Sequence, residues 1–194
     1  RIVIGFEMRP APLDASHAEK MLHYRALVEA AGGQWREGRV HLIALRGYDL
    51  QRQQRHPTFV RPDFVDTLVV AGWQNGEPVV HEFVGSTYPA RTSIPLDAEG
   101  VIPPDVSRPR AGDPDIGMIA EGAYRAAPNG DFLGEPSFHM TFRGSGRIPG
   151  YRNTNQDHFY SQEERIASVN AGHTQGAILL HTGVGNAVAS IGCH

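Results

Sequence analysis

The strongest constraint on the fold is the dipeptide Asn75-Gly76, which separates two runs rich in β-branched residues. Asn-Gly between apolar runs is a strong signal for a two-residue hairpin turn, because both turn positions adopt positive φ angles. The runs 64–73 and 78–84 are therefore predicted to be antiparallel partner strands. This hairpin predicts that a β-sheet forms the framework of the chain.

The composition of the chain is that of a globular protein. Its 194 residues suit one domain with a sizeable core, and 40% hydrophobic with 20% charged residues argue against global disorder. The 22 glycines and 14 prolines favour a loop-rich fold that contains strands over a helical bundle. The net charge is −3, the Lys and Arg residues are scattered, and no apolar run has the length of a membrane span. These features argue against a nucleic-acid-binding or membrane-spanning protein.

Two segments carry signals for helices. Ser16-x-x-Glu19 is a capping-box pattern, apolar residues follow it at helical spacing, and Gly32-Gly33 supplies a stop. These signals predict an amphipathic helix over 16–31. A second, shorter helical segment is predicted over 161–168.

Short apolar runs outside the hairpin predict further strands. The run 2–6 is expected to form an edge strand. The other predicted strands are 40–45, 118–124, 137–142 and 177–181. The Pro- and Asp-rich segment 85–117 is predicted to be a long surface excursion, and 144–156 to be a loop. The whole pattern predicts a β-rich α+β domain, in which 1–36 is an N-terminal strand and helix extension to 37–194.

Candidate chemistry is concentrated in the last residues of the chain. Cys193 is the only cysteine, and His181 ends an apolar run twelve residues before it. A thiol attacks carbonyl carbon as the thiolate, so it needs a nearby base or a depressed pKa. Gly192 would allow close approach to a substrate, and its amide together with that of Cys193 could form an oxyanion hole. This pattern indicates a histidine-activated thiol nucleophile.

Three other interpretations of these residues remain open. Cys193 could be a small buried hydrophobic residue, as most free cysteines are. A zinc site could use His173, His181, Cys193 and His194, but no paired ligand spacing is present, so neither a metal nor another cofactor is expected. Ser190 could serve a serine hydrolase, although Ser190-Ile-Gly-Cys193 does not fit the G-x-S-x-G pattern.

The motif Leu180-His181-Thr182-Gly183 followed by Ser190-x-Gly192-Cys193 resembles the L,D-transpeptidase (YkuD-like) signature. It is most similar to a divergent branch of phage-like and secreted bacterial proteins. The segments 66–70 and 152–157 fit the same branch, so the resemblance covers about residue 40 to the end. Ile191 stands where the signature usually has a histidine.

The resemblance implies a β-sandwich-like fold of mixed small sheets, with cysteine and histidine at the end of a cleft and an N-terminal helix. Cys193 would be the nucleophile and His181 the general base, oriented by the backbone carbonyl of Thr182. Gly192 would contribute to the oxyanion hole. The implied substrate-binding residues are Ser190, Asn186, His139 and Tyr124. From the residues alone, the favoured interpretation of His139 is an exposed histidine, and that of Tyr124 is a packing tyrosine.

These features lead to the hypothesis of a periplasmic or secreted cysteine enzyme that acts on peptidoglycan stem peptides by transpeptidation, exchange or L,D-carboxypeptidase hydrolysis. It could be a secreted antibacterial toxin, with an immunity or delivery protein as a partner. Non-catalytic peptidoglycan binding and a phage structural role are the alternatives. Because the proposed nucleophile is the penultimate residue, we also expect the full polypeptide to extend beyond His194.

Overall fold

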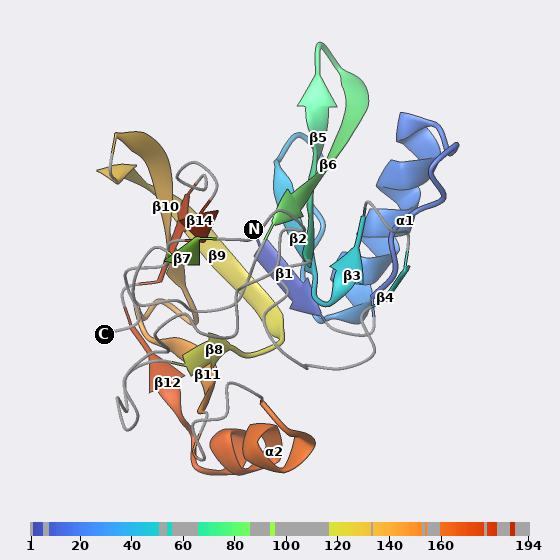
Figure 1. Cartoon of the computed structure of the whole chain (residues 1–194). Helices are drawn as coiled ribbons and strands as arrows, with labels where there is room; N and C mark the ends of the chain where they lie inside the picture. The colour runs from blue at the N-terminus through green and yellow to red at the C-terminus, as the bar shows by residue number, and fades with distance from the viewer. Residues whose placement is uncertain are drawn as a thin grey trace. The chain divides into compact units, whose positions relative to one another are not determined.

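The computed structural model describes residues 2–5, 8–50, 54–55, 66–85, 94–95, 117–132, 134–152, 154, 160–176, 178–181 and 187–188. These residues form a β-rich α+β structure with two helices (Figure 1). The chain divides into two compact units. Unit 1 is Arg1–Pro57, Val65–Ser86 and Glu121–Arg125, and unit 2 is Thr58–Phe64, Thr87–Ala120 and Ala126–His194.

Unit 1 is built on a mixed sheet with the strand order β9-β1-β2-β5-β6. The strands are β1 (Ile2–Gly5), β2 (His41–Leu45), β5 (Asp66–Gln74), β6 (Glu77–Gly85) and the first residues of β9 (Gly122–Phe132). Two shorter strands, β3 (Tyr48–Asp49) and β4 (Gln54–Arg55), pair with each other.

Strand β1 is an interior strand, which corrects the prediction that 2–6 forms an edge. It pairs parallel with β2, from Ile2 opposite Leu42 to Gly5 opposite Leu45, and antiparallel with β9 on its other side. Parallel neighbours require a long crossover, and helix α1 (His17–Ala30) supplies it between β1 and β2. Unit 1 contains the N-terminal strand and helix together with β2, and the predicted boundary between 36 and 37 stays a prediction.

The predicted hairpin is confirmed. Strands β5 and β6 pair in register from Asp66 opposite Gly85 to Gln74 opposite Glu77. Asn75 and Gly76 have φ angles of 52° and 83°. Positive φ at both positions defines a turn whose twist matches that of the strands, which explains why Asn-Gly occupies it.

Helix α1 has both predicted end signals. The Ser16 hydroxyl accepts a hydrogen bond from the Glu19 amide at 3.3 Å, and the Glu19 carboxylate accepts one from the Ser16 amide at 2.8 Å. At the other end the Gly33 amide donates to the Val28 carbonyl at 2.8 Å, and Gly32 has φ of 76°. A left-handed residue at this position closes the helix, and glycine adopts it without a steric penalty.

The buried side of α1 packs on β5 and β6 of unit 1 (Figure 1). Met21, Tyr24 and Val28 supply the helix side of this core. The sheet side is supplied by Val3, Ile43, Leu45, Val69, Ala71 and Val80. This apolar layer is the main stabilising feature of unit 1, since burial of such side chains contributes about 1.5–3 kcal/mol each.

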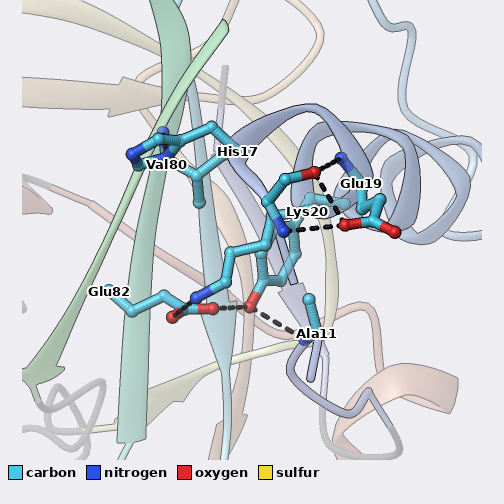
Figure 2. Close-up of polar contacts among 8 residues, drawn as sticks. Ala11, His17, Glu19, Lys20, Val80 and Glu82 are labelled. Carbon is cyan, nitrogen blue, oxygen red and sulfur yellow. Dashed lines mark hydrogen bonds and ion pairs between the residues drawn. The ribbon is translucent and has the colours of Figure 1, made fainter. Parts of the chain in front are cut away.

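A polar cluster fixes α1 against β6 at the margin of this core (Figure 2). The Glu82 carboxylate forms an ion pair with Lys20 at 2.7 Å and accepts a hydrogen bond from the Tyr24 hydroxyl. That hydroxyl accepts a hydrogen bond from the Ala11 amide at 3.1 Å. The Lys20 and Glu82 side chains are only 12% and 10% exposed, so each charge depends on the other for compensation.

Helix α1 also covers part of strand β6, the last strand in the order of unit 1. The Val80 amide donates to His17 Nδ1 at 3.0 Å, so this amide is directed to the helix (Figure 2). Pro78, two residues earlier, has no amide hydrogen. Exposed strand edges promote unwanted pairing between chains, and these two residues reduce the donors that β6 presents.

The described residues of unit 2 form several small strand groups and one helix. Strands β8 (Gly117–Ile119), β11 (Ile148–Arg152) and β12 (Thr174–Gln175) form one sheet in the order β12-β11-β8. The rest of β9 adjoins β10 (Glu135–Thr141), which pairs with β13 (Leu179–His181). Strand β7 (Ile94–Pro95) pairs with β14 (Ala187–Val188). Helix α2 (Gln162–Asn170) packs on β11 (Figure 1).

Unit 2 confirms some strand predictions and corrects others. The run 137–142 corresponds to β10, and 177–181 contains β13. The run 118–124 belongs to two strands, β8 and β9. The strand is interrupted between Ile119 and Gly122, and Gly122 has φ of 149°. The segment 144–156, predicted as loop, contains β11. In the predicted excursion 85–117, Gly85 is the last residue of β6, and apart from Ile94–Pro95 and Gly117 the other residues lie outside the described residues.

Neither of the two helices in the described part of the chain is long and apolar enough to cross a membrane.

The Tyr24 hydroxyl is predicted to contribute measurably to stability. Tyr24→Phe removes the acceptor of the Ala11 amide and the donor to Glu82, so we expect the free energy of unfolding of unit 1 to fall by about 1–3 kcal/mol. Urea titration followed by tryptophan fluorescence measures this, since both tryptophans, Trp35 and Trp73, pack on that core. Glu29→Gln, in an exposed pair with Arg25, is the control and should change stability by less than about 0.5 kcal/mol. Equal effects would contradict the role of Tyr24.

Unit 1 should also lose stability at alkaline pH through Tyr24. Burial and the hydrogen bond to Glu82 raise the pKa of Tyr24 well above its ordinary value near 10. Above that pH the unfolded chain releases the proton while the folded chain retains it, so stability is complete below pH 10 and falls as pH rises. Between pH 9 and 11 the wild type should lose about 1.4 kcal/mol more than Tyr24→Phe in the same urea titration. Parallel pH profiles would contradict this.

Candidate functional site

The proposed base His181 is the last residue of strand β13. This strand is held antiparallel on β10, with Ser137 opposite His181 and His139 opposite Leu179. By this register, positions 139 and 181 are diagonal neighbours on one face of the strand pair. The proposed nucleophile Cys193 and the other predicted residues of the C-terminal motif, Thr182, Asn186, Ser190 and Gly192, lie outside the described residues.

The two predicted substrate-binding residues that the structure describes lie in different units. His139 is half-buried in unit 2, and a Cβ on Gly146 would lie 3.2 Å from its Cε1, so its ring packs on that glycine. Tyr124 is only 3% exposed within β9 of unit 1, which fits a packing role. In β10, the strand that contains His139, Phe138 is 39% exposed, whereas Met140 is buried.

The described residues contain no group of three His, Cys, Asp or Glu side chains with the arrangement of a metal site. Of the four residues in the zinc interpretation, only the His173 side chain is described. Its backbone amide donates to the Ser168 carbonyl at 2.9 Å at the end of α2, and its carbonyl accepts from the Gly150 amide at 3.2 Å. These contacts place His173 between helix α2 and strand β11.

The described residues of unit 2 surround a pocket of about 570 Å³. Strand β11, strand β12 and the end of α2 form its walls. The lining residues are Arg147, Arg152, Thr154, Ala167, Ser168, Ala171, Gly172, His173, Thr174, Gln175 and Gly176. This volume lies within the range of small-molecule sites, about 300–1,000 Å³.

Hydrogen bonds from α2 fix the wall formed by β11 and by Thr154, two residues beyond that strand. Glu164, at the third position of α2, is only 8% exposed and accepts from the Thr154 amide at 2.7 Å, the Thr154 hydroxyl at 2.8 Å and the Ser161 amide at 3.1 Å. The Ser168 hydroxyl accepts from the Arg152 amide at 2.8 Å and donates to the Glu164 carbonyl at 2.7 Å. One carboxylate therefore completes the capping box and also holds the adjoining chain.

Arg147 is fixed across the pocket by strand β12. Its Nε donates to the Thr174 hydroxyl at 2.9 Å and its Nη2 to the Thr174 carbonyl at 3.0 Å. A guanidinium is planar and carries five N–H groups, so two bonds from one edge set the direction of the opposite end. The orientation of Arg147 is thus determined by the protein itself.

Gln175 forms a buried part of the wall. Its Nε2 donates to the Met118 carbonyl at 3.3 Å, which connects β12 to β8. A Cβ on Gly150 would lie 2.1 Å from that nitrogen, so only glycine at 150 leaves room for the amide. The side-chain conformation of Gln175 therefore depends on a residue of the neighbouring strand.

Only one local sequence signal relates to this pocket. Gly and Pro in Ile148-Pro-Gly-Tyr-Arg152 obscured strand β11, although Ile148 and Tyr151 are buried. The one available signal was Ser161-x-x-Glu164, a second capping box that predicts where α2 begins. Arg147 and Thr174 are distant in sequence, so their contact is visible only in the folded chain.

The chain matches no protein-family model, no curated protein and no solved structure. The candidate sites therefore have to be judged on their own chemistry.

Neighbouring glutamates in α2 provide a matched test of the Glu164 contacts. Glu164→Gln replaces one acceptor oxygen with a donor, so at least one of the amides of Thr154 and Ser161, which bond to different oxygens, should exchange with solvent at least about tenfold faster, as loss of about 1.4 kcal/mol implies. Glu163→Gln changes an exposed residue of the same turn and should leave both rates unchanged. Hydrogen exchange followed by NMR measures the rates. Unchanged protection in Glu164→Gln would contradict the assigned role.

Proposed function

We propose that the chain is a cysteine-dependent enzyme that modifies peptidoglycan stem peptides. The thiolate of Cys193 attacks the carbonyl carbon of a diamino-acid–D-Ala bond, and His181 accepts the thiol proton. The tetrahedral intermediate then collapses to a thioester, and His181 returns the proton to the leaving amine. An amine acceptor gives a cross-link or an exchange product, and water gives L,D-carboxypeptidase hydrolysis.

The observation that supports this proposal is the position of His181 in the fold. It is the final residue of a strand, and β10 holds that strand in a defined register. A general base has to be held by a rigid element while the substrate side remains accessible, and the end of a short paired strand meets the first requirement. The Gly-rich segment that follows leads to Cys193 within twelve residues.

The direct test is incubation with purified muropeptides followed by mass spectrometry. We expect the wild type to give loss of D-Ala, exchange of D-Ala or dimer formation, and each of these products identifies a different reaction. Cys193→Ala should abolish every product because the thioester cannot form. An unchanged muropeptide profile with the wild type would contradict the proposal and favour a binding or structural role.

Thiol labelling separates catalytic from inert cysteine without a substrate. Iodoacetamide should alkylate Cys193 rapidly near pH 7, and His181→Ala should slow alkylation by about tenfold or more because the base is lost. His81→Ala changes an exposed histidine of unit 1 and should leave the rate unchanged. Slow labelling in the wild type, or equal rates in all three proteins, would contradict the assigned roles.

A further inference from the structure

We propose that the unit 2 pocket between β11, β12 and the end of α2 binds a small polar ligand through a carboxylate group, with Arg147 as the principal anchor and Arg152 as the second cation. This proposal concerns residues outside the Cys193–His181 pair. It therefore holds or fails independently of the proposed enzyme activity.

The charges of the lining residues favour an anionic ligand. Arg147 and Arg152 are exposed, His173 is half-buried, and no Asp or Glu is among the described residues that line the pocket. The Glu164 carboxylate accepts hydrogen bonds from the amides of Thr154 and Ser161. Arg147 forms no ion pair with the described residues, so its charge favours an anionic ligand even in a chain whose net charge is −3.

The orientation of the Arg147 guanidinium suits a carboxylate group. Thr174 occupies Nε and one N–H of Nη2, and the remaining N–H groups have no partner among the described residues. These remaining groups include the Nη1–Nη2 end of the fork, whose two parallel N–H bonds match the two oxygens of a carboxylate. Because Thr174 already fixes the Arg147 side chain, that side chain loses little conformational entropy when a ligand binds.

The backbone amides favour a carboxylate over a phosphate. Phosphate sites commonly use several unpaired backbone N–H groups at a helix N-terminus or in a nest. Here five amides of the lining residues already donate within the protein, and α2 presents its C-terminal end. These amides are those of Arg152, Thr154, Ala171, Gly172 and His173. The pocket thus recognises an anion through side-chain guanidinium groups.

The C-terminal end of α2 does not prevent anion binding at Arg147. The carbonyls of Ser168 and Val169 accept hydrogen bonds from the amides of His173 and Gly172 at 2.9 and 3.0 Å. This Schellman pattern, with Gly172 at φ of 64°, satisfies carbonyls that would otherwise face the pocket. The remaining negative end of the helix dipole is screened by salt and acts only near the last turn.

The other lining residues define the kind of ligand. Ala167, Ala171, Gly172 and Gly176 leave space, and Thr154, Ser168 and Thr174 contribute hydroxyl groups. The described lining residues include no Phe, Tyr or Trp, so they offer little surface for stacking a base. A small, hydrophilic carboxylate such as a dicarboxylic acid or a short peptide fits these walls better than a nucleotide or an apolar ligand.

Calorimetric titration at low ionic strength tests the proposal with three probes. Succinate should bind more tightly than inorganic phosphate, and neutral succinamide should not bind. Arg147→Gln and Arg152→Gln should each weaken succinate binding by about tenfold or more, as expected for loss of a charged hydrogen bond. Arg147→Lys should recover only part of the affinity, because a lysine lacks the planar fork.

Arg25→Gln is the matched control, because it removes one exposed arginine of unit 1, remote in sequence from the pocket. Its succinate affinity should equal that of the wild type. Circular dichroism melts establish that each variant folds, and Arg152→Gln decides the outcome if Arg147→Gln does not fold. The proposal is overturned by absence of succinate binding, by tighter binding of phosphate, by unchanged affinity in the pocket variants, or by an equal loss in Arg25→Gln.

Discussion

The parallel pairing of β1 with β2 is the constraint on which unit 1 depends. Two parallel neighbours cannot be joined by a tight turn, so the chain between them has to cross one face of the sheet. Helix α1 makes this crossing, and its apolar side then covers β5 and β6. The buried cluster of Lys20, Tyr24 and Glu82 fixes the helix at one position on β6, because displacement would leave buried charges without partners. The same helix brings His17 to the Val80 amide.

Unit 2 uses a different device to position its elements, because its strands are short. Single polar side chains connect segments that are distant in sequence. Glu164 and Ser168 join α2 to the end of β11, Arg147 joins the residue before β11 to β12, and Gln175 joins β12 to β8. Short strands have few ladder hydrogen bonds, so such side-chain bonds determine where the strands lie. The pocket proposed to bind a carboxylate is enclosed by these contacts. The strand that bears His181 is held by its backbone pairing with β10.

Much of the local structure was predictable, and the site only partly. The capping boxes at Ser16 and Ser161 and the Asn75-Gly76 turn each predicted an element that the structure contains. The histidine-bearing strand was also predicted, and His181 ends it. The run 118–124 was misjudged because the break at Gly122 has no strong turn signal, and β11 because Pro149 and Gly150 resemble loop residues. The roles of Cys193 and His181 as nucleophile and base stay predictions.

The sequence by itself determined the features that depend on residues a few positions apart: where the helices begin and end, where the hairpin turns, and which residue types could supply a nucleophile and a base. These features follow from backbone preferences and short-range hydrogen bonds, which act within one turn of chain. Only the tertiary structure decided that β1 is an interior strand, that the N-terminal helix belongs to the first sheet, and that Arg147 meets Thr174. These long-range contacts depend on which distant segments bury surface together. Local sequence preferences do not specify a partner many positions away.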